Sequence, residues 1–283
     1  MANGNPAAGP RPPARSGAAR GRPSPRKSWK NPSTVLITGA SGGIGAALAR
    51  SYAEPGRTLI LHGRDHARLA AVMRECERQG AQVHGANFDL RDAEAAISAL
   101  RTLSGRHVID LAVVNAGVTR SIGDGLEAEN WETARAVLSV NLDGAIATVA
   151  GVLPEMRRRG AGQIAIVSSL AAYFGLPVTP IYCASKAALK AYGEALRGWL
   201  AHRGVAVNVV LPGYVRTAMN EHDRGPQPLS MSPERAAILI RRGLERNRAR
   251  IAFPLSLAWA MWFLSVLPAP LAQWMVRRAG FGR

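Results

Sequence analysis

A glycine-rich turn between an apolar strand and a helix constrains the fold of this chain more than any other segment. The apolar residues 35–37 lead into the turn from Thr38 to Gly45, and a helical pattern follows directly. Glycines let the backbone turn tightly and approach a ligand, and a helix start offers unpaired N–H groups and the positive end of its dipole. The segment therefore predicts a phosphate-binding turn in a βαβ unit.

The end of the next predicted strand, Arg57–His62, indicates which dinucleotide would bind there. An acidic residue at this place usually binds the ribose hydroxyls of the unphosphorylated cofactor. Here the strand is followed by Arg64, whose guanidinium suits a 2′-phosphate. Asp65 is an alternative ribose ligand if the strand ends one residue later. Arg64 and Arg68 are otherwise ordinary solvated charges at a helix start.

Tyr182 and Lys186 form a second constellation. Their four-residue spacing puts both side chains on one face of a predicted helix. A fixed ammonium about one turn away favours the phenolate, which makes the phenol a better proton donor near neutrality. Taken alone, Tyr-x-x-x-Lys also describes an exposed lysine beside a half-buried tyrosine, so the rest of the chain has to decide between the two.

Further motifs follow in a fixed order. Asn115-Ala116-Gly117 comes after the predicted strand 110–114, Asn141 follows, Ser169 comes after the strand 164–168, and Pro212-Gly213 comes after the strand 205–211. With the glycine turn and the Tyr-Lys pair, these motifs make residues 33 to 220 resemble the short-chain dehydrogenase/reductase family. Ser169, and not Ser168, stands thirteen positions before Tyr182, as in the family pattern.

The resemblance implies an α/β fold: one Rossmann-type, doubly wound, mostly parallel sheet with helices on both faces. It also implies an NAD(P)-dependent enzyme acting on CH-OH and C=O groups. Tyr182 would exchange the proton, and Lys186 would assist it and hold the nicotinamide ribose. Ser169 would hydrogen-bond the substrate oxygen, and Asn141 would position a water that links Lys186 to solvent.

The cofactor implied by the resemblance is NADP(H), favoured by Arg64, with NAD(H) as the alternative and with no metal. Asp89, which follows a third predicted strand at Gln82 to Ala86, resembles the family's adenine-contacting acid, although a surface-turn role competes. The residues expected to contact the cofactor are Thr38, Gly39, Ser41, Gly43, Ile44, Gly45, Arg64, Asp89, Asn115, Gly117, Tyr182, Lys186, Pro212, Gly213, Val215 and Thr217.

Composition divides the chain into a leader at residues 1–32, a catalytic domain at 33–253 and an apolar extension at 254–283. The first thirty residues hold seven basic residues, no acidic one and no apolar run, so we expect disorder and no secretory signal. Neither Cys76 nor Cys183 demands a disulfide, which favours the cytoplasm. Cys183 is expected to be a packing residue. A net charge of +17 raises nucleic acid as a partner, but no nucleic-acid motif accompanies it.

The extension favours an anionic membrane surface as the partner for that charge. No charged residue occurs from Pro254 to Val276, and arginines flank the segment on both sides. Pro268 and Pro270 interrupt it after thirteen positions, too early for a spanning helix, so an angled helical pair in one leaflet is expected. The alternative is a tail that covers the substrate cleft or a dimer partner. A broad apolar stripe over 185–202 fits a homo-oligomer, dimer or tetramer, or burial within one subunit.

Both readings of the extension favour a hydrophobic substrate, and family members with such C-terminal extensions include reductases resembling those for 3-ketosphinganine. The leading prediction is therefore a lipid-like ketone of that kind. Reduction of a 3-oxoacyl thioester on an acidic carrier protein is the second candidate, and a steroid or retinoid-type alcohol is the third. A candidate of another class is a non-catalytic, nucleotide-sensing scaffold at the membrane. The segment between Thr217 and Pro233 is expected to select the ligand.

Overall fold

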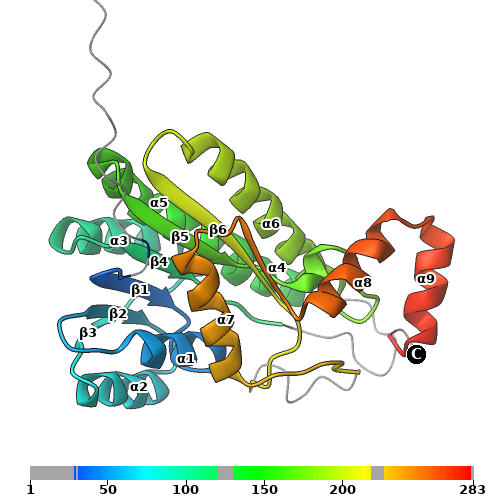
Figure 1. Ribbon diagram of the computed structural model, residues 1–283, viewed down its shortest axis with the longest axis horizontal. Helices are drawn as coiled ribbons and strands as arrows, with labels where there is room; N and C mark the ends of the chain where they lie inside the picture. Colours follow the sequence, from blue (N-terminus) through cyan, green and yellow to red (C-terminus); the bar gives the residue numbers. More distant parts are fainter. Residues whose placement is uncertain (1–28, 30, 120–129, 218–225, 282–283) are drawn as a thin grey trace, which may run out of the picture.

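The seven strands of this protein form one parallel sheet, seen in a computed structural model that describes residues 29, 31–119, 130–217 and 226–281 (Figure 1). Their order is β3-β2-β1-β4-β5-β6-β7, and every neighbouring pair is parallel. This confirms the predicted Rossmann-type fold. The strands are β1 Thr34–Thr38, β2 Thr58–His62, β3 Gln82–Ala86, β4 Leu111–Val114, β5 Gly162–Val167, β6 Val205–Pro212 and β7 Arg250–Phe253.

Helices connect the strands, as parallel pairing requires. Asp65, Asp92, Asn130 and Ser232 accept a backbone N–H at the start of α2, α3, α4 and α7, which is why these helices begin there. The helices are α1 Gly43–Tyr52, α2 His66–Arg78, α3 Ala93–Arg106, α4 Trp131–Leu138, α5 Gly144–Arg159, α6 Pro180–Leu200, α7 Pro233–Glu245, α8 Leu255–Val266 and α9 Ala269–Arg278, with a π-helical turn η1 Ser139–Asp143 and a 3₁₀ turn η2 Leu170–Ala172.

Alternate strand residues point to opposite faces, so the sheet has a core on each side. Val35 and Ile37 belong to the cluster covered by α1, α2 and α7. Leu36 belongs to the other cluster, which α3, α5 and α6 cover. The apolar stripe of α6 is part of this second core through Leu189, so within the described residues burial inside one subunit accounts for much of it.

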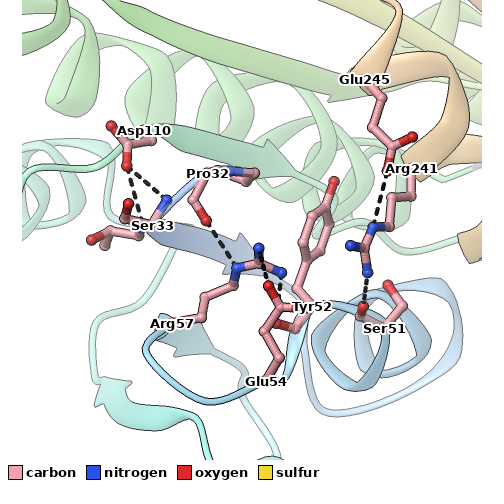
Figure 2. Close-up of polar contacts among 10 residues, drawn as sticks. Pro32, Ser33, Ser51, Tyr52, Glu54, Arg57, Asp110, Arg241 and Glu245 are labelled. Atoms are coloured by element: carbon pink, nitrogen blue, oxygen red, sulfur yellow. Dashed lines mark hydrogen bonds and ion pairs between the residues drawn. The ribbon is translucent and has the colours of Figure 1, made fainter. Parts of the chain in front are cut away.

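A buried arginine joins the segment before β1 to the domain, at the amino ends of the strands (Figure 2). The Arg57 guanidinium donates to the carbonyl oxygens of Pro32 and Tyr52, at 2.9 and 3.0 Å, and forms an ion pair with Glu54. Arg241 of α7 lies over the Tyr52 ring and donates to the Ser51 carbonyl. Burial raises the pKa of Tyr52, so the phenol is neutral. This cluster lies at the sheet edge away from the predicted site.

The continuous helix Trp131–Arg159, which comprises α4, η1 and α5, has the length and composition of a membrane span. However, 56% of its most apolar window is buried inside the protein. Gly151 shows how closely it packs, because a Cβ there would lie 2.4 Å from Cβ of Leu100 on α3. This helix is therefore a core element of the fold.

The C-terminal extension forms two helices, α8 and α9, which project from the carboxyl end of β7 (Figure 1). The break between them lies at Leu267 and Pro268, where the prolines predicted it. Ala258 and Met261 on the inner side of α8 pack with Leu170 in a cluster of their own. The predicted disorder of the leader falls almost wholly outside the described residues, as does most of the predicted ligand-selecting segment.

Candidate active site

The glycine turn joins β1 to α1 with the tight geometry that its sequence predicts. Gly39 and Gly43 have φ angles of 69° and 53°, in the left-handed region that favours glycine. A Cβ at Gly45 would lie 2.2 Å from the Gly39 carbonyl oxygen, so any side chain there would displace the turn. The Ala40 N–H donates to the His62 carbonyl at 2.8 Å, which holds the turn beside the end of β2.

Thr38 and Asn115 hold the glycine turn against the end of β4. The Thr38 hydroxyl is fully buried and accepts the backbone N–H groups of Asn115 and Ala116, at 3.0 and 3.2 Å. The Asn115 amide donates to the carbonyls of Thr38 and Gly39, at 3.0 and 3.2 Å. Neighbouring loops at the carboxyl edge of the sheet therefore support each other without a ligand.

Arg64 follows β2, and its exposed side chain lines a cavity at the carboxyl ends of the strands. Asp65 is the N-cap of α2: it accepts the Arg68 N–H at 3.0 Å and forms an ion pair with the Arg68 side chain at 3.2 Å. The strand ends at His62 and not one residue later. Asp65 is thus engaged in capping, and Arg64, Arg68 and Arg91 are basic side chains that line the cavity.

Asp89 lies on the same rim of the cavity, after β3. Its carboxylate accepts the backbone N–H and the guanidinium of Arg91, which together hold the pKa of Asp89 below its usual value. His62 stacks on Phe88 with ring centroids 4.3 Å apart, and its Nε2 lies 2.9 Å from the Phe88 carbonyl oxygen. Burial lowers the pKa of His62, so the stacked His62 and Phe88 rings are a neutral part of the cavity wall.

Tyr182 and Lys186 lie on the first turns of α6, which begins at Pro180, earlier than the stripe at 185–202 suggested. Proline at the first helical position has its φ preset and lacks only an N–H that would be unpaired there. The Lys186 Nζ lies 5.7 Å from the centroid of the Tyr182 ring. The two side chains therefore share one helix face, as their spacing predicts.

Lys186 is buried, and hydrogen bonds hold both its amino group and its backbone carbonyl. Its Nζ donates to the Val167 carbonyl oxygen at 3.1 Å, and its own carbonyl accepts the Ser168 hydroxyl at 2.6 Å. Burial lowers the pKa of Lys186 to about 8. The amino group thus combines a fixed position with a protonation equilibrium near the physiological range.

Asn141 lies in η1, whose wider π-helical turn carries the side chain toward the end of β4. Its Oδ1 accepts the Val118 N–H at 2.7 Å, and its Nδ2 donates to the Val118 carbonyl at 2.9 Å and to the Ser185 hydroxyl at 3.1 Å. A Cβ on Gly117 would lie 3.3 Å from this Oδ1 and 3.4 Å from the Lys186 Nζ. Glycine at position 117 therefore leaves room between the amide and the amine.

Ser169 and Ser168 have different environments at the end of β5. Ser168 is buried, and its hydroxyl donates a hydrogen bond to the backbone carbonyl of Lys186 in α6. Ser169 is partly exposed, accepts the Ala171 N–H at 3.1 Å and begins η2. Its hydroxyl is 3.5 Å from the Pro212 carbonyl, a weak contact. Ser169 is thus the more exposed of the two serines that line the cavity, and its catalytic role stays a prediction.

One cavity of about 600 Å³ runs along the carboxyl edge of the sheet from the glycine turn to Tyr182 and Lys186. Thr38, Gly45 and Asn141 are not among the residues that line it, and the expected cofactor contacts of Thr38 and Gly45 stay predictions. The predicted residues that line it are Gly39, Ser41, Gly43, Ile44, Arg64, Asp89, Asn115, Gly117, Ser169, Tyr182, Lys186, Pro212, Gly213, Val215 and Thr217.

The cavity fits a dinucleotide in its dimensions and its donors. The N-terminus of α1 has no side-chain cap, which leaves its N–H groups for a ligand. A Cβ on Gly43 would lie 2.9 Å from the Thr217 Cγ2, so the turn and the segment after β6 enclose the same space. Within the described residues, no cluster of metal-ligating side chains is present.

Several supporting residues had no recognisable sequence signal. Val118, Val167, Ser168 and Ser185 hold Asn141 and Lys186 through the hydrogen bonds described above. Ser168 and Ser185 each adjoin a motif residue, which is the only hint that the sequence offers. The two valines act through backbone atoms, which no side-chain pattern can indicate.

Comparison with known proteins agrees with the fold and the motifs. The short chain dehydrogenase family model matches residues 33–227. An uncharacterized oxidoreductase of Myxococcus xanthus is 36% identical over 248 residues, 87% of this chain and 96% of the relative. Estradiol 17-beta-dehydrogenase 1 of Rattus norvegicus is 33% identical over 204 residues, 68% of this chain and 56% of the relative.

A short-chain dehydrogenase from Sphingobium yanoikuyae, solved in complex with NADPH, superimposes with a TM-score of 0.73 at 26% identity. The match covers 86% of this chain and 95% of that structure. The matching family model, the strand order of the sheet and the geometry of the motif residues all indicate one family. The chain belongs to the short-chain dehydrogenase/reductase family and is an NAD(P)-dependent oxidoreductase that acts on carbonyl or hydroxyl groups.

Proposed function

We propose that this protein is an NADPH-dependent reductase of a hydrophobic, lipid-like ketone, similar in class to 3-ketosphinganine. The convergence of Ser169, Tyr182 and Lys186 on one cavity, with Asn141 directly behind it, is the observation that carries the reductase assignment. The cofactor supplies the hydride when it is bound. The residues of the chain orient the carbonyl and deliver the proton.

Tyr182 donates the proton to the carbonyl oxygen, and the Ser169 hydroxyl hydrogen-bonds the same oxygen as negative charge develops on it. Lys186 holds its ammonium beside the phenol and binds ribose hydroxyls. A water between Asn141 and Lys186 returns the proton from solvent. Support for this last step is the space over Gly117, because the Asn141 Oδ1 and the Lys186 Nζ both lie near the point where a Cβ would stand.

The preference for NADPH rests on Arg64, with NAD(H) as the alternative. Asp65, the competing ribose ligand, caps α2 instead. The NADPH complex of the Sphingobium relative supports the same choice. A reduced, phosphorylated cofactor favours carbonyl reduction as the direction.

The hydrophobic substrate is inferred from the apolar surroundings of the serine. Leu170 directly follows Ser169 and packs with Met261 of α8, and Tyr173 and Phe174 join the same cluster. The resemblance of the extension to those of lipid-ketone reductases favours the same class, and we include peripheral association of residues 254–283 with an anionic membrane in this proposal. We include a homodimer or tetramer in this proposal because oligomers are common in the family.

The test is reduced-nicotinamide oxidation by the purified full chain in mixed micelles. NADPH and NADH would each be offered with long-chain 3-keto-lipids, 3-oxoacyl thioesters on a carrier protein, and steroid ketones, beside Tyr182→Phe. Turnover of a free keto-lipid that Tyr182→Phe abolishes is expected.

Other results would identify the alternatives. Activity confined to carrier-bound thioesters would make the enzyme a 3-oxoacyl carrier-protein reductase. Activity confined to steroids would favour the dehydrogenase alternative, which the estradiol 17-beta-dehydrogenase relative supports. A cellular phenotype that persists in Tyr182→Phe together with membrane recruitment would favour the scaffold.

A further inference from the structure

Helix α8 is apolar on every side, although only one side is buried. Its inner side carries Ala258 and Met261, which are each 8% exposed and pack on Leu170. Its outer side carries Leu255 and Trp259, which are 68% and 65% exposed. A helix that is hydrophobic all round is normally covered on all sides. We therefore expect a binding partner to cover the outer side of α8.

The exposed residues form one continuous stripe. Leu255, Trp259, Trp262 and Val266 follow the spacing of a single helix face, and the rings of the two tryptophans meet edge to face at 5.6 Å. Helix α9 carries further exposed apolar side chains after the proline turn. The α8–α9 apolar face consists of Leu255, Trp259, Trp262, Phe263, Val266, Leu271, Trp274 and Met275.

The charged residues in this last part of the sequence are all of one sign. No acidic residue occurs between Glu245 and the last residue, whereas six arginines do. Arg277 and Arg278 end α9, and the Arg278 guanidinium lies 5.5 Å from the centre of the Trp274 ring. Tryptophan beside arginine is the composition of a bilayer interface, where the ring lies at headgroup level and the cation meets lipid phosphate.

A second copy of this chain is a poorer occupant than a lipid surface. It would bring the same arginines and no acidic side chain from its own extension, so like charges would face each other. The proline turn between α8 and α9 also suits a pair of helices lying along an interface. Neither helix is long enough to cross a bilayer.

The stripe lies at the catalytic end of the molecule. Helix α8 begins where β7 ends, and the carboxyl ends of parallel strands share the edge that holds the cavity. A Cβ on Gly213, which lines the cavity, would lie 3.1 Å from Leu257 of α8. A surface that binds the outer side of α8 would therefore lie next to the active site.

We propose that the α8–α9 apolar face inserts into the interfacial layer of an anionic lipid bilayer and turns the catalytic end of the sheet toward the lipid. A ketone embedded in the bilayer would then reach Tyr182 without crossing water. The delivery step rests on the proposed reductase activity, whereas the membrane contact rests on the α8–α9 apolar face alone.

The experiment is flotation of the full chain with vesicles of phosphatidylcholine alone or mixed with phosphatidylglycerol. The mixed vesicles should bind the protein, and Trp259→Glu should weaken that binding about tenfold or more. Trp131→Glu is the matched control, because Trp131 is 69% exposed on α4, outside this face. It should bind as the unchanged protein does. Val266→Glu repeats the test, and thermal melting with NADPH binding confirms that each variant is folded.

Vesicle binding at raised salt distinguishes the contribution of the apolar face from that of the basic leader at residues 1–32. Insertion of the apolar face should leave measurable binding at high salt, which Trp259→Glu lacks, because only the electrostatic part is screened. Failure to float with mixed vesicles, or equal binding by Trp259→Glu, would overturn the proposal. So would a dimer that Trp259→Glu converts to monomer in analytical ultracentrifugation, since the face would then be a self-association surface.

Turnover distinguishes this proposal from the proposed function. Trp259→Glu should retain its rate on a short, water-soluble ketone and lose rate only on a long-chain ketone carried in vesicles. Binding that depends on Trp259, with no turnover of any lipid ketone, would keep the membrane face and reject the substrate class. Lipid-ketone turnover in micelles without vesicle binding would keep the substrate class and reject the membrane face.

Discussion

The Lys186 Nζ lies 5.7 Å from the centre of the Tyr182 ring, and the same nitrogen donates to the Val167 carbonyl at the end of β5. This link fixes the lysine between helix and sheet, so its charge stays beside the phenol. A lysine free to rotate would place that charge in solvent for much of the time. This arrangement is the one that the proposed proton transfer by Tyr182 requires.

Replacing Tyr182 with Phe keeps the ring and removes the proton donor. We expect kcat to fall about a hundred- to ten-thousand-fold, the usual contribution of general acid catalysis. NADPH affinity, followed by quenching of protein fluorescence, should change little, because the ring and Lys186 remain. A variant that keeps most of its kcat would show that another group supplies the proton.

Replacing Arg64 with Ala should affect the two cofactors differently. We expect kcat/KM with NADPH to fall about ten- to a hundredfold, as loss of a charge-assisted hydrogen bond implies, and kcat/KM with NADH to stay nearly constant. Arg78→Ala, at the far end of α2 and outside the cavity, is the control. Equal losses with both cofactors would count against a 2′-phosphate contact.

Replacing Gly45 with Ala tests the packing of the glycine turn. The new Cβ would lie 2.2 Å from the Gly39 carbonyl oxygen, so backbone must move, and we expect a loss of about 1–3 kcal/mol or more in the free energy of unfolding. Gly42→Ala is the control, because nothing lies within 4 Å of a Cβ there and its φ is extended, at −176°. It should cost about 0.5 kcal/mol or less.

Thermal melting of the cofactor-free protein measures the stability of the two glycine variants, and titration with NADPH measures their affinity for the cofactor. Gly45→Ala should melt earlier and bind NADPH more weakly, since the turn that meets the phosphates is displaced. Equal melting temperatures for the two variants would mean that the turn adapts to a side chain at position 45.

Much of the fold was readable because the glycine turn, the apolar strands and the motif order all specify the same topology. The strand predicted over Gln82 to Ala86 is found with those bounds, and the break at Pro268 follows from the missing N–H of proline. The start of α6 was less clear, since no side-chain cap marks it. Helix ends depend on capping more than on periodicity.

The support of the site could not be read from the sequence, because it depends on backbone atoms and on an irregular helix. Asn141 meets Val118 only because η1 widens the turn, and nothing in a 3.6-residue pattern marks a π-helical turn. Thr38 was expected to face the cofactor, yet its hydroxyl accepts two N–H groups from the end of β4. Such pairings become visible only when β1 and β4 are neighbours in the sheet.

Replacing Lys186 with Met should abolish turnover and make the stability of the cofactor-free protein respond differently to pH. Burial lowers the pKa of Lys186 to about 8 in the folded state, against an ordinary value of 10.5. Below pH 8 both states are protonated, and the folded state carries the full cost of a buried charge. Between the two values only the unfolded state keeps the proton, so the stability of the unchanged protein rises with pH.

Methionine does not titrate. The free energy of unfolding of Lys186→Met, relative to that of the unchanged protein, should therefore be highest near pH 7 and fall as the pH rises toward 10. The expected fall is roughly 1–3 kcal/mol, since one unit of pKa corresponds to about 1.4 kcal/mol. Chemical denaturation at pH 7 and pH 10 measures it, and titrations common to both proteins cancel. Lys190→Met, which removes the partner of Glu194 at 3.1 Å, should show no gain at pH 7. A difference that stays flat with pH would mean that the folded protein holds the Lys186 ammonium without cost, in which case this amine is a permanent cation at the site.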